Sequence, residues 1–261
     1  MSDVTGMGRG RGRDAGTREL EWSRRIGEAL RRDLFVLHAQ RIVDVASGET
    51  VRHELFLRMV ERKRLIPAGE FVLAAEELGS IREIDRWVTG RALEVAAMGH
   101  AVDLNLSVRS ADDELLELIE RKLDDTGADP ANLVLELSEE QLVAGLEGSE
   151  GFVRAVHELG CGIALDGYIQ GGRRSFLLRR VPIDFVKLGA QFINGLTTDG
   201  RRRRKASNAV LRAHRHGQRV IAQGVEDLVT LQLLQELGID EAQGYALGGP
   251  ESTESLLAAK A

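Results

Sequence analysis

The chain has 261 residues, 43% of them hydrophobic, and a formal net charge of -6 with acidic and basic residues interspersed. This length is ample for one large hydrophobic core or two small ones. The charge balance argues against a dedicated nucleic-acid surface, and no apolar run has the length of a membrane span. We therefore expect a soluble, cytoplasmic protein without a membrane partner.

The N-terminal segment MSDVTGMGRGRGRDAGTRE is rich in glycine and arginine and has no apolar stretch after its basic residues. It therefore lacks the pattern of a secretory signal. We expect a flexible leader over residues 1–20 and one folded domain over residues 21–261. The single cysteine, Cys161, excludes an intramolecular disulfide, and its place in LGCGIAL predicts a small buried residue rather than a reactive thiol.

Short β-type runs alternate with longer segments of helical period along the rest of the chain. The candidate strands are residues 35–43, 50–58, 101–107, 132–138, 162–166, 185–188, 219–225 and 242–247. Apolar residues three and four apart predict helices at 82–99, 113–127, 151–160, 206–217 and 228–238, each ending in a glycine.

Strand and helix alternate about eight times, which predicts an α/β barrel of mostly parallel strands. Only VASGET joins the first two strands, which is too short for a crossover helix, so we expect that pair to be antiparallel. The basic run RRRRK (201–205) precedes a predicted helix, where it indicates a solvated surface rather than a nucleic-acid patch.

Polar residues interrupt or end the apolar runs of successive strands. A lone acid in such a place is usually solvated, and a lone asparagine usually satisfies a turn. A whole series on different strands predicts that the side chains meet in one cavity, because a barrel of this type carries its chemistry where its strands end. Carboxylate and amide oxygens suit Mg²⁺, Mn²⁺ or Ca²⁺. The series consists of Glu54, Asn105, Glu136, Asp166, Lys187, Gln223 and Gln243.

Longer motifs surround these residues. They include HAQRI, HELFLR, IPAGEFVLAAEELGSIREIDRWV, LNLS, LELSEEQL, PIDFVKLGAQFI and EAQGYALGGP. In this order, over about residues 33 to 250, they resemble the EAL domain family, whose active members are phosphodiesterases that cleave the bacterial messenger cyclic di-GMP. The resemblance implies an α/β fold of the EAL type, a modified TIM barrel with an antiparallel strand near its start.

The resemblance also implies roles for individual residues. It implies a metal site for Mg²⁺ or Mn²⁺ formed by Glu54, Asn105, Glu136 and Asp166, with a protein that holds no metal as the alternative. Glu139 matches a glutamate that steadies the loop after the fifth strand, and a homodimer through helices near strands five and six is a further expectation. The residues expected to contact cyclic di-GMP are Gln40, Glu54, Leu55, Arg58, Asp85, Asn105, Asp166, Lys187, Glu226 and Gln243.

Three positions depart from the pattern of active members. Gly167 stands at the second aspartate of DDFGTGYSS, Gln223 at the first glutamate of AEGVE, and Gly189 at the acid of KID. Gly167 offers a second metal no ligand, and Gln223 is neutral and cannot accept a proton as a general base. Of the catalytic set, Lys187 is kept, whereas Gln223 and Gly167 are degenerate.

Three functions follow as hypotheses. The leading one is a catalytically degenerate EAL domain that binds cyclic di-GMP and passes the signal to an unidentified partner protein. The first alternative is a weak metal-dependent phosphodiesterase that gives pGpG, and the second is a protein-interaction module that no longer binds nucleotide. The arginines of GYIQGGRRS (167–175) suit phosphate contacts, with a solvated loop as the alternative.

Overall fold

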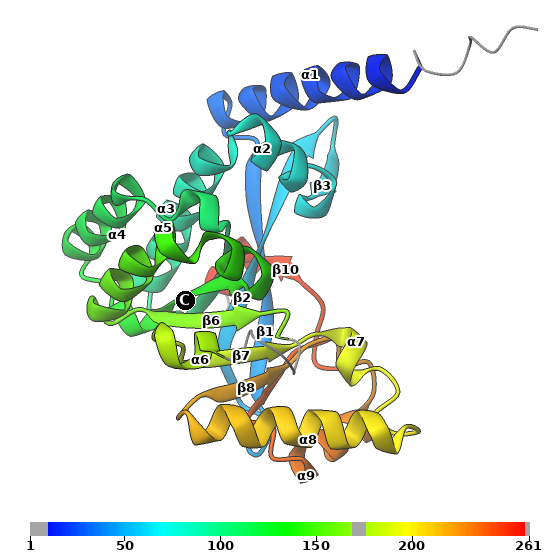
Figure 1. Cartoon of the computed structure of the whole chain (residues 1–261). Coiled ribbons are helices and arrows are strands. Elements are labelled where there is room, and N and C mark those ends of the chain that lie inside the picture. The colour runs from blue at the N-terminus through cyan, green and yellow to red at the C-terminus, as the bar shows by residue number, and fades with distance from the viewer. Residues whose placement is uncertain (1–9, 169–175, 259–261) are drawn as a thin grey trace, which may run out of the picture.

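The computed structural model describes residues 10–168 and 176–258, and its centre is a closed barrel (Figure 1). The ring closes because the first strand pairs with the second strand on one side and with the last barrel strand on the other. In ring order the barrel strands are β1 (Phe35–Asp44), β9 (Glu241–Ala242), β8 (Arg219–Ala222), β7 (Phe185–Leu188), β6 (Gly162–Asp166), β5 (Leu133–Ser138), β4 (Val102–Leu106) and β2 (Thr50–Glu61).

Strand β1 is antiparallel to both of its ring neighbours, while the pairs from β2 through β4 to β9 are parallel. This confirms the predicted α/β barrel with an antiparallel strand near its start. Two further strands lie outside the ring: β3 (Arg64–Pro67) pairs with β2, and β10 (Glu251–Ser252) pairs with β1.

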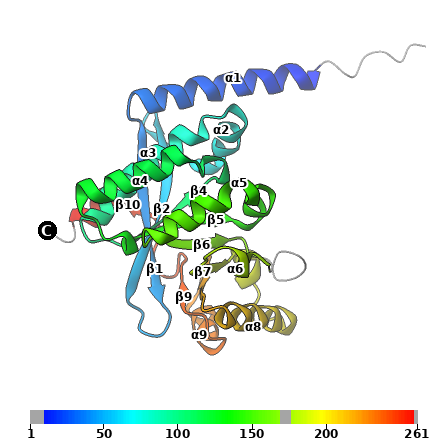
Figure 2. The ribbon, with the colours of Figure 1, turned by 60° about the vertical axis from the view of Figure 1, so that its left-hand side comes forward.

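Helices surround the barrel, and α1 lies at the opposite end of the molecule from α8 and α9 (Figures 1 and 2). Three short 3-10 turns, Ala68–Glu70, Val108–Ser110 and Pro130–Asn132, complete the elements. The helices are α1 (Gly10–Arg31), α2 (Val72–Leu78), α3 (Ile81–Ala97), α4 (Asp113–Thr126), α5 (Glu139–Glu158), α6 (Leu177–Arg180), α7 (Ala190–Ile193), α8 (Gly200–Arg215), α9 (Leu228–Glu236) and α10 (Thr253–Ala258).

The five predicted helices are present, but two begin earlier than predicted. Helix α5 starts at Glu139, directly after β5, and α8 starts at Gly200. The run 201–205 therefore forms the first turn of α8 instead of preceding it. The side chain of Asp199 accepts hydrogen bonds from the backbone N–H groups of Arg201 and Arg202, which caps the helix at that point.

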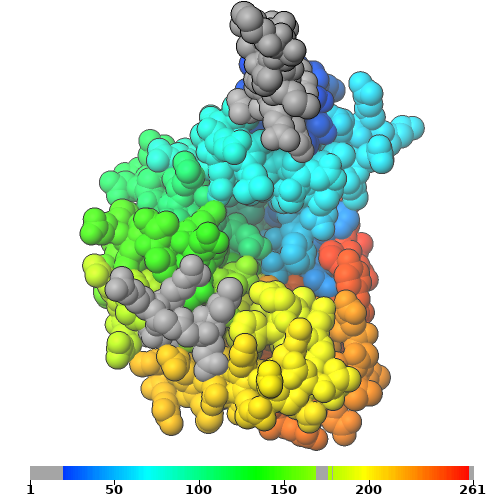
Figure 3. Space-filling model, turned by 45° about the vertical axis from the view of Figure 1, so that its right-hand side comes forward, coloured from blue at the N-terminus to red at the C-terminus, as the bar shows by residue number. Residues whose placement is uncertain are grey.

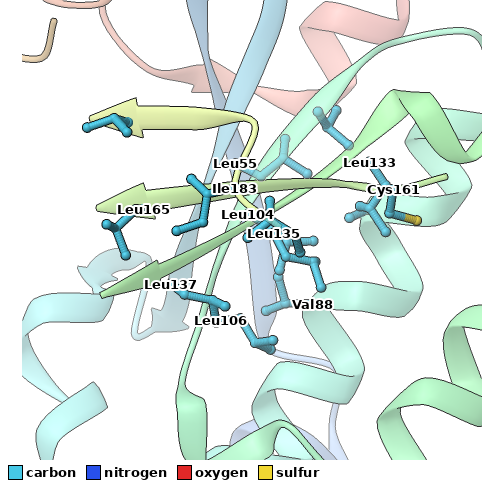
Figure 4. Close-up of a cluster of buried hydrophobic side chains, with 14 of the residues drawn as sticks. Leu55, Val88, Leu104, Leu106, Leu133, Leu135, Leu137, Cys161, Leu165 and Ile183 are labelled. Carbon is cyan, nitrogen blue, oxygen red and sulfur yellow. The ribbon is translucent and has the colours of Figure 1, made fainter. Parts of the chain in front are cut away.

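The hydrophobic core fills the space between the barrel strands and the helices (Figure 4). Leu104, Leu135 and Leu165 on neighbouring strands are fully buried together with Val88 of α3. Cys161 is 2% exposed, and burial raises the pKa of its thiol to about 12, which confirms the predicted small buried residue.

A buried ion cluster lies at the starts of the strands. Arg52 of β2 donates from Nε to Asp103 Oδ1 at 2.8 Å and from its terminal nitrogens to the Glu241 carboxylate. Its guanidinium also stacks 4.0 Å from the ring centroid of Phe185. Since both acids are buried, Arg52 is their main source of charge compensation.

The predicted strand at 242–247 is wrong beyond its first residue. After β9 the chain turns, with Leu247 N–H donating to Gly244 O, and the backbone of Gly244 presses against Val225. A Cβ at Gly244 would lie 2.2 Å from Val225 N, so this turn depends on glycine. The strand predicted to reach 225 likewise ends at Ala222, just before Gly224, whose φ is +73°.

The predicted boundary at residue 20 falls within α1. Residues 1–9 of the predicted leader lie outside the described residues, while residues 10–20 are helical. Farther along α1, Trp22 and Ile26 are buried in the same core as Phe35 and Phe71. No helix in the described ranges is both long and apolar enough to cross a membrane.

Candidate functional site

Four of the predicted residues, which come from β2, β4, β5 and β7, meet in one cluster. Asn105 Nδ2 donates to Glu54 Oε1 at 2.8 Å, and Lys187 Nζ donates to Glu54 Oε2, also at 2.8 Å. Lys187 Nζ also donates a very short hydrogen bond to Glu136 Oε1. The register explains the meeting, because Asn105 lies opposite Glu136 in the parallel β4–β5 ladder.

Lys187 is fully buried, and its ammonium group lies between the carboxylates of this cluster. Burial lowers the pKa of its ammonium, but the carboxylates of Glu136, Glu54, Asp103 and Asp166 outweigh burial, so the pKa is raised. The lysine therefore stays protonated and offsets part of the negative charge around it.

Gln223 lies between Asp166 and Lys187. With its amide oriented to satisfy both neighbours, Nε2 donates to Asp166 Oδ1 at 3.2 Å, and Oε1 accepts from Lys187 Nζ at 3.3 Å. The amide thus links the acid at the end of β6 to the lysine of β7. It fills a position in the cluster without adding a charge.

Gln40 and Gln243 form a second part of the site. Gln243 Nε2 donates to Gln40 Oε1 at 3.1 Å, and Gln40 Nε2 donates to the backbone oxygen of Gly248 at 2.7 Å. Gln40 lies opposite Glu54 in the β1–β2 ladder, which places this pair next to the carboxylate cluster. Both glutamines are buried and held in place by one another.

A cavity of about 300 Å³ opens beside the cluster and is bounded by the 3-10 turn Ala68–Glu70, by α2 and α3, and by the ends of β4, β5 and β6. Its walls are mostly apolar, with a few carboxylates, amides and hydroxyls, which is the composition of a small-molecule site. Its lining residues are Leu55, Phe56, Leu57, Ala68, Gly69, Val72, Glu76, Ile81, Ile84, Asp85, Val88, Asn105, Leu106, Ser107, Glu136, Ser138, Gln141 and Asp166.

Asp85 and Glu136 are both strongly perturbed acids in this cavity wall. Burial, with Glu54 and Asp103 nearby, raises the pKa of Glu136 well above its usual value. Asp85 is perturbed through its own network. Burial raises its pKa to about 7, although hydrogen bonds from Ser110 and from the backbone of Ser107 act in the opposite direction, and Glu76 adds to the rise. Glu76 Oε1 in turn accepts from Ser107 Oγ and from Gln141 Nε2, both at 2.7 Å. The sequence analysis singled out Asp85 but missed the network that holds it.

The cluster has the donor chemistry of a cation site. Oε2 of Glu136 is buried without a hydrogen-bond partner, which suits a hard cation, as do the nearby oxygens of Glu54 and Asn105. However, no group of three His, Cys, Asp or Glu side chains in the described ranges has the arrangement of a formed metal site. The Lys187 ammonium bonds to two of the four predicted ligands, so a cation would compete with it.

The EAL domain family matches residues 23–250, which is most of the chain. The chain belongs to the EAL domain family. The match covers every barrel strand and the whole cluster described above.

Two curated proteins similar to this EAL domain are longer chains. The signaling protein YkoW of Bacillus subtilis is 30% identical over 86% of this chain and 29% of its own length. The bifunctional diguanylate cyclase/cyclic di-GMP phosphodiesterase MucR of Pseudomonas aeruginosa is 29% identical over 93% of this chain and 37% of its own length. The chain thus spans about a third of the length of these relatives.

Solved EAL structures share the fold. The PaMucR phosphodiesterase in a c-di-GMP complex matches with a TM-score of 0.83 at 28% identity, over 90% of this chain and 99% of that chain. The FimX EAL domain of Pseudomonas aeruginosa bound to c-di-GMP has a TM-score of 0.83 at 24% identity, over 88% of this chain and 96% of that chain. At that identity the FimX match speaks for the fold alone.

Two of the positions predicted to depart from the active EAL pattern, Gly167 and Gly189, have different surroundings. Gly167 has φ of +69° with open space where a side chain would stand. At Gly189 the space is taken: a Cβ there would lie 2.6 Å from Gln191 Oε1 and 3.0 Å from its Cδ. Gln191, which the sequence analysis did not single out, thus fills the space that a side chain at Gly189 would need. Its polar side chain, two positions after Gly189, was the available signal.

Other predicted residues lie apart from the cluster. Arg58 is half-buried farther along β2, where it donates to Leu57 O at 3.0 Å. Glu226 is exposed and makes no hydrogen bond or ion pair with a described residue of the cluster. Glu139 is buried at the start of α5. Glu139 was predicted to steady the loop that follows β6. Most of that loop, residues 169–175 with the two arginines Arg173 and Arg174, lies outside the described residues.

Proposed function

We propose that this EAL domain binds cyclic di-GMP as a receptor and hydrolyses it poorly. One observation carries the proposal: the Gln223 amide bridges Asp166 and Lys187, at a position where the family's active members have a carboxylate. A carboxylate there could accept a proton from water, whereas an amide cannot at neutral pH. The amide keeps the cluster together while the base is absent.

The ligand-binding side of the site supports the same proposal. The cavity beside the cluster is lined by Leu55, Asp85 and Asn105, and Gln40 and Gln243 are held in place by their mutual hydrogen bond. A preformed polar wall lowers the cost of ordering side chains when a ligand binds. The similar PaMucR phosphodiesterase was solved with c-di-GMP, which makes this nucleotide the first to test.

Slow hydrolysis to pGpG is the second candidate, and the buried, unpartnered Oε2 of Glu136 favours it. Glu54, Asn105, Glu136 and Asp166 would hold one Mg²⁺ or Mn²⁺, which would supply positive charge near the phosphodiester. The chain's own contribution would be to orient the ligand and to keep Lys187 protonated beside it. With Gly167 at the position of the second metal's aspartate, we propose at most weak activity.

Isothermal titration with cyclic di-GMP, with and without Mg²⁺, tests the receptor proposal. We expect micromolar or tighter binding that Arg58→Ala weakens at least tenfold, while Arg204→Ala, an exposed charge on α8, leaves it unchanged. Absence of binding heat at micromolar protein would overturn the receptor proposal and leave the protein-interaction module as the hypothesis to pursue.

Chromatography of the nucleotide after incubation separates the two candidates. A receptor leaves cyclic di-GMP intact over hours, whereas a weak phosphodiesterase forms pGpG that disappears in Glu54→Ala. We also propose an unidentified signalling partner, a homodimer and a cytoplasmic location. The curated relatives are about three times as long as the region they share with this chain, so in them the EAL domain is accompanied by further sequence.

A further inference from the structure

A separate pocket of about 330 Å³ lies on the outside of the barrel, between α6 and α8. Residues 190–215, which include α8, lie in the lower half of the molecule in yellow to gold (Figure 3). The described residues that line the pocket bring three guanidinium groups, an imidazole and an amide together, and none of them is acidic. They are Arg179, Asn208, Leu211, Arg212, Arg215 and His216.

Neighbouring arginines on the same side of the barrel are paired with acids, whereas those of the pocket have no ion pair with a described residue. Arg180, next to Arg179, pairs with Glu150 at 2.8 Å, and Arg219 pairs with Glu241 at 3.0 Å. Within the described ranges, Arg179, Arg212 and Arg215 form no ion pair. Unpaired like charges repel one another, so an anion that neutralised them would be favoured.

The charge of α8 strengthens this local excess. Seven of its 16 residues are arginine or lysine and none is acidic, in a chain whose net charge is -6. Helix α8 therefore has a net positive charge, in contrast to the net negative charge of the whole chain. Such a positive charge raises the local density of small anions.

The geometry favours a compact anion. Arg212 and Arg215 are three residues apart on α8, hence on one face of the helix, and Arg179 approaches from α6. Guanidinium groups bind phosphate oxygens through paired hydrogen bonds, which a lone ammonium cannot match. Among the described lining residues, only Leu211, which is 54% exposed, is apolar. The pocket therefore favours a charged ligand over an apolar one.

We propose that the pocket between α6 and α8 binds the phosphate or pyrophosphate group of a small molecule, held by Arg179, Arg212 and Arg215. The site is separate from the cavity at the barrel end, with which it shares no lining residue in the described ranges. It does not depend on cyclic di-GMP binding.

Titration calorimetry of the whole chain with pyrophosphate, at constant ionic strength set with sodium chloride, tests this proposal. We expect saturable binding that Arg179→Gln and Arg215→Gln each weaken at least fivefold. Arg204→Gln removes one charge from the same helix outside the pocket and is expected to leave the affinity unchanged. Equal weakening in all three variants, or no binding to the wild-type chain, would overturn the proposal.

The choice of variants avoids a structural side effect. Arg212 lies near the buried phenol of Tyr168, whose pKa is raised by burial and lowered in part by the Arg212 charge. Tyr168 follows Asp166 by two residues, so a change at Arg212 could disturb the barrel site, whereas Arg179 and Arg215 are exposed. Unchanged cyclic di-GMP titration in Arg179→Gln would show that the two sites are independent.

The source of the phosphate is distinguished by parallel titrations with inorganic phosphate, pyrophosphate and a nucleoside diphosphate. Tighter binding of the nucleoside diphosphate than of pyrophosphate assigns the site to nucleotides, because the nucleoside then adds contacts. Equal affinities assign it to the phosphate groups alone. In either case, Arg179→Gln must weaken the affinity for the ligand at least fivefold, as it does for pyrophosphate.

Discussion

The ammonium of Lys187 lies 2.8 Å from the carboxylate of Glu54, and both side chains are buried at the end of the barrel. Lys187 also bonds to Glu136, so one cation serves two buried acids. A buried charge that loses its partner is costly, because neither water nor another ion replaces the lost interaction. Lys187 therefore has a structural role whether or not the site is catalytic.

Replacing this lysine is predicted to destabilise the fold and to create a dependence on metal. Lys187→Met leaves Glu54 and Glu136 without their ammonium, and we expect the free energy of unfolding to fall by about 3–5 kcal/mol. Mg²⁺ would restore part of the loss by neutralising the same carboxylates. Urea denaturation with and without MgCl₂ measures both effects.

The matched control for this experiment is Lys205→Met, an exposed lysine on α8. We expect it to change stability by less than about 0.5 kcal/mol and to show no response to Mg²⁺. If Lys187→Met is as stable as the control, the ammonium does not compensate the two acids.

Placing carboxylates at positions 167 and 223 is predicted to raise hydrolysis. Gly167→Asp has free space, although the φ of +69° costs about 1 kcal/mol for a residue with a side chain. Combined with Gln223→Glu it returns a metal ligand and a general base, and pGpG formation measured by chromatography should increase at least tenfold over wild type.

An acid at position 189 needs a companion change. Gly189→Asp alone would collide with the Gln191 amide, so we expect it to lower stability, whereas Gly189→Asp with Gln191→Ala should be tolerated. Thermal unfolding compares the two. Equal unfolding temperatures would mean that the Gln191 side chain moves aside freely.

The stability of the protein should decline with rising pH because of Asp85. Its pKa in the folded state is raised from 3.8 to about 7, so the folded state holds a proton that the unfolded state releases between these values. The contribution of Asp85 to the free energy of unfolding is fully present below about pH 4. It is lost as the pH rises from there through about 7. Asp85→Asn should therefore be more stable than wild type at pH 8, by on the order of 4 kcal/mol, and more stable by only about 1 kcal/mol at pH 4.5. Urea denaturation at both pH values provides the test, and a pH-independent difference would contradict the assignment.

The ion cluster at the strand starts gives a prediction about stability alone. Arg52→Met leaves Asp103 and Glu241 buried without their main cation, so we expect a loss of about 3–5 kcal/mol. Arg219→Met is the control, because Arg219 bonds to the same Glu241 but its side chain is 47% exposed. A loss in Arg52→Met no larger than in the control would show that water reaches the two acids.

Several parts of the fold could be predicted from the sequence because they depend on local patterns. Alternating apolar runs gave strands β1, β2 and β4–β8 to within a few residues, and glycines marked the ends of five helices. The short VASGET connection required an antiparallel first pair, which the β1–β2 ladder confirms. The strand at 242–247 was wrong because the packing of Gly244 on Val225 is a contact between distant segments.

The sequence by itself determined the EAL barrel and the residue types at positions 167, 189 and 223, since each of these is a matter of residue identity and order. Only the tertiary structure decided the surroundings of those positions. It leaves open space beside Gly167, and it places the Gln191 side chain beside Gly189 and the Gln223 amide between Asp166 and Lys187. It also gathers Arg179 with Arg212 and Arg215, because closing the barrel brings helices from separate segments together, and no local pattern encodes the distance between them.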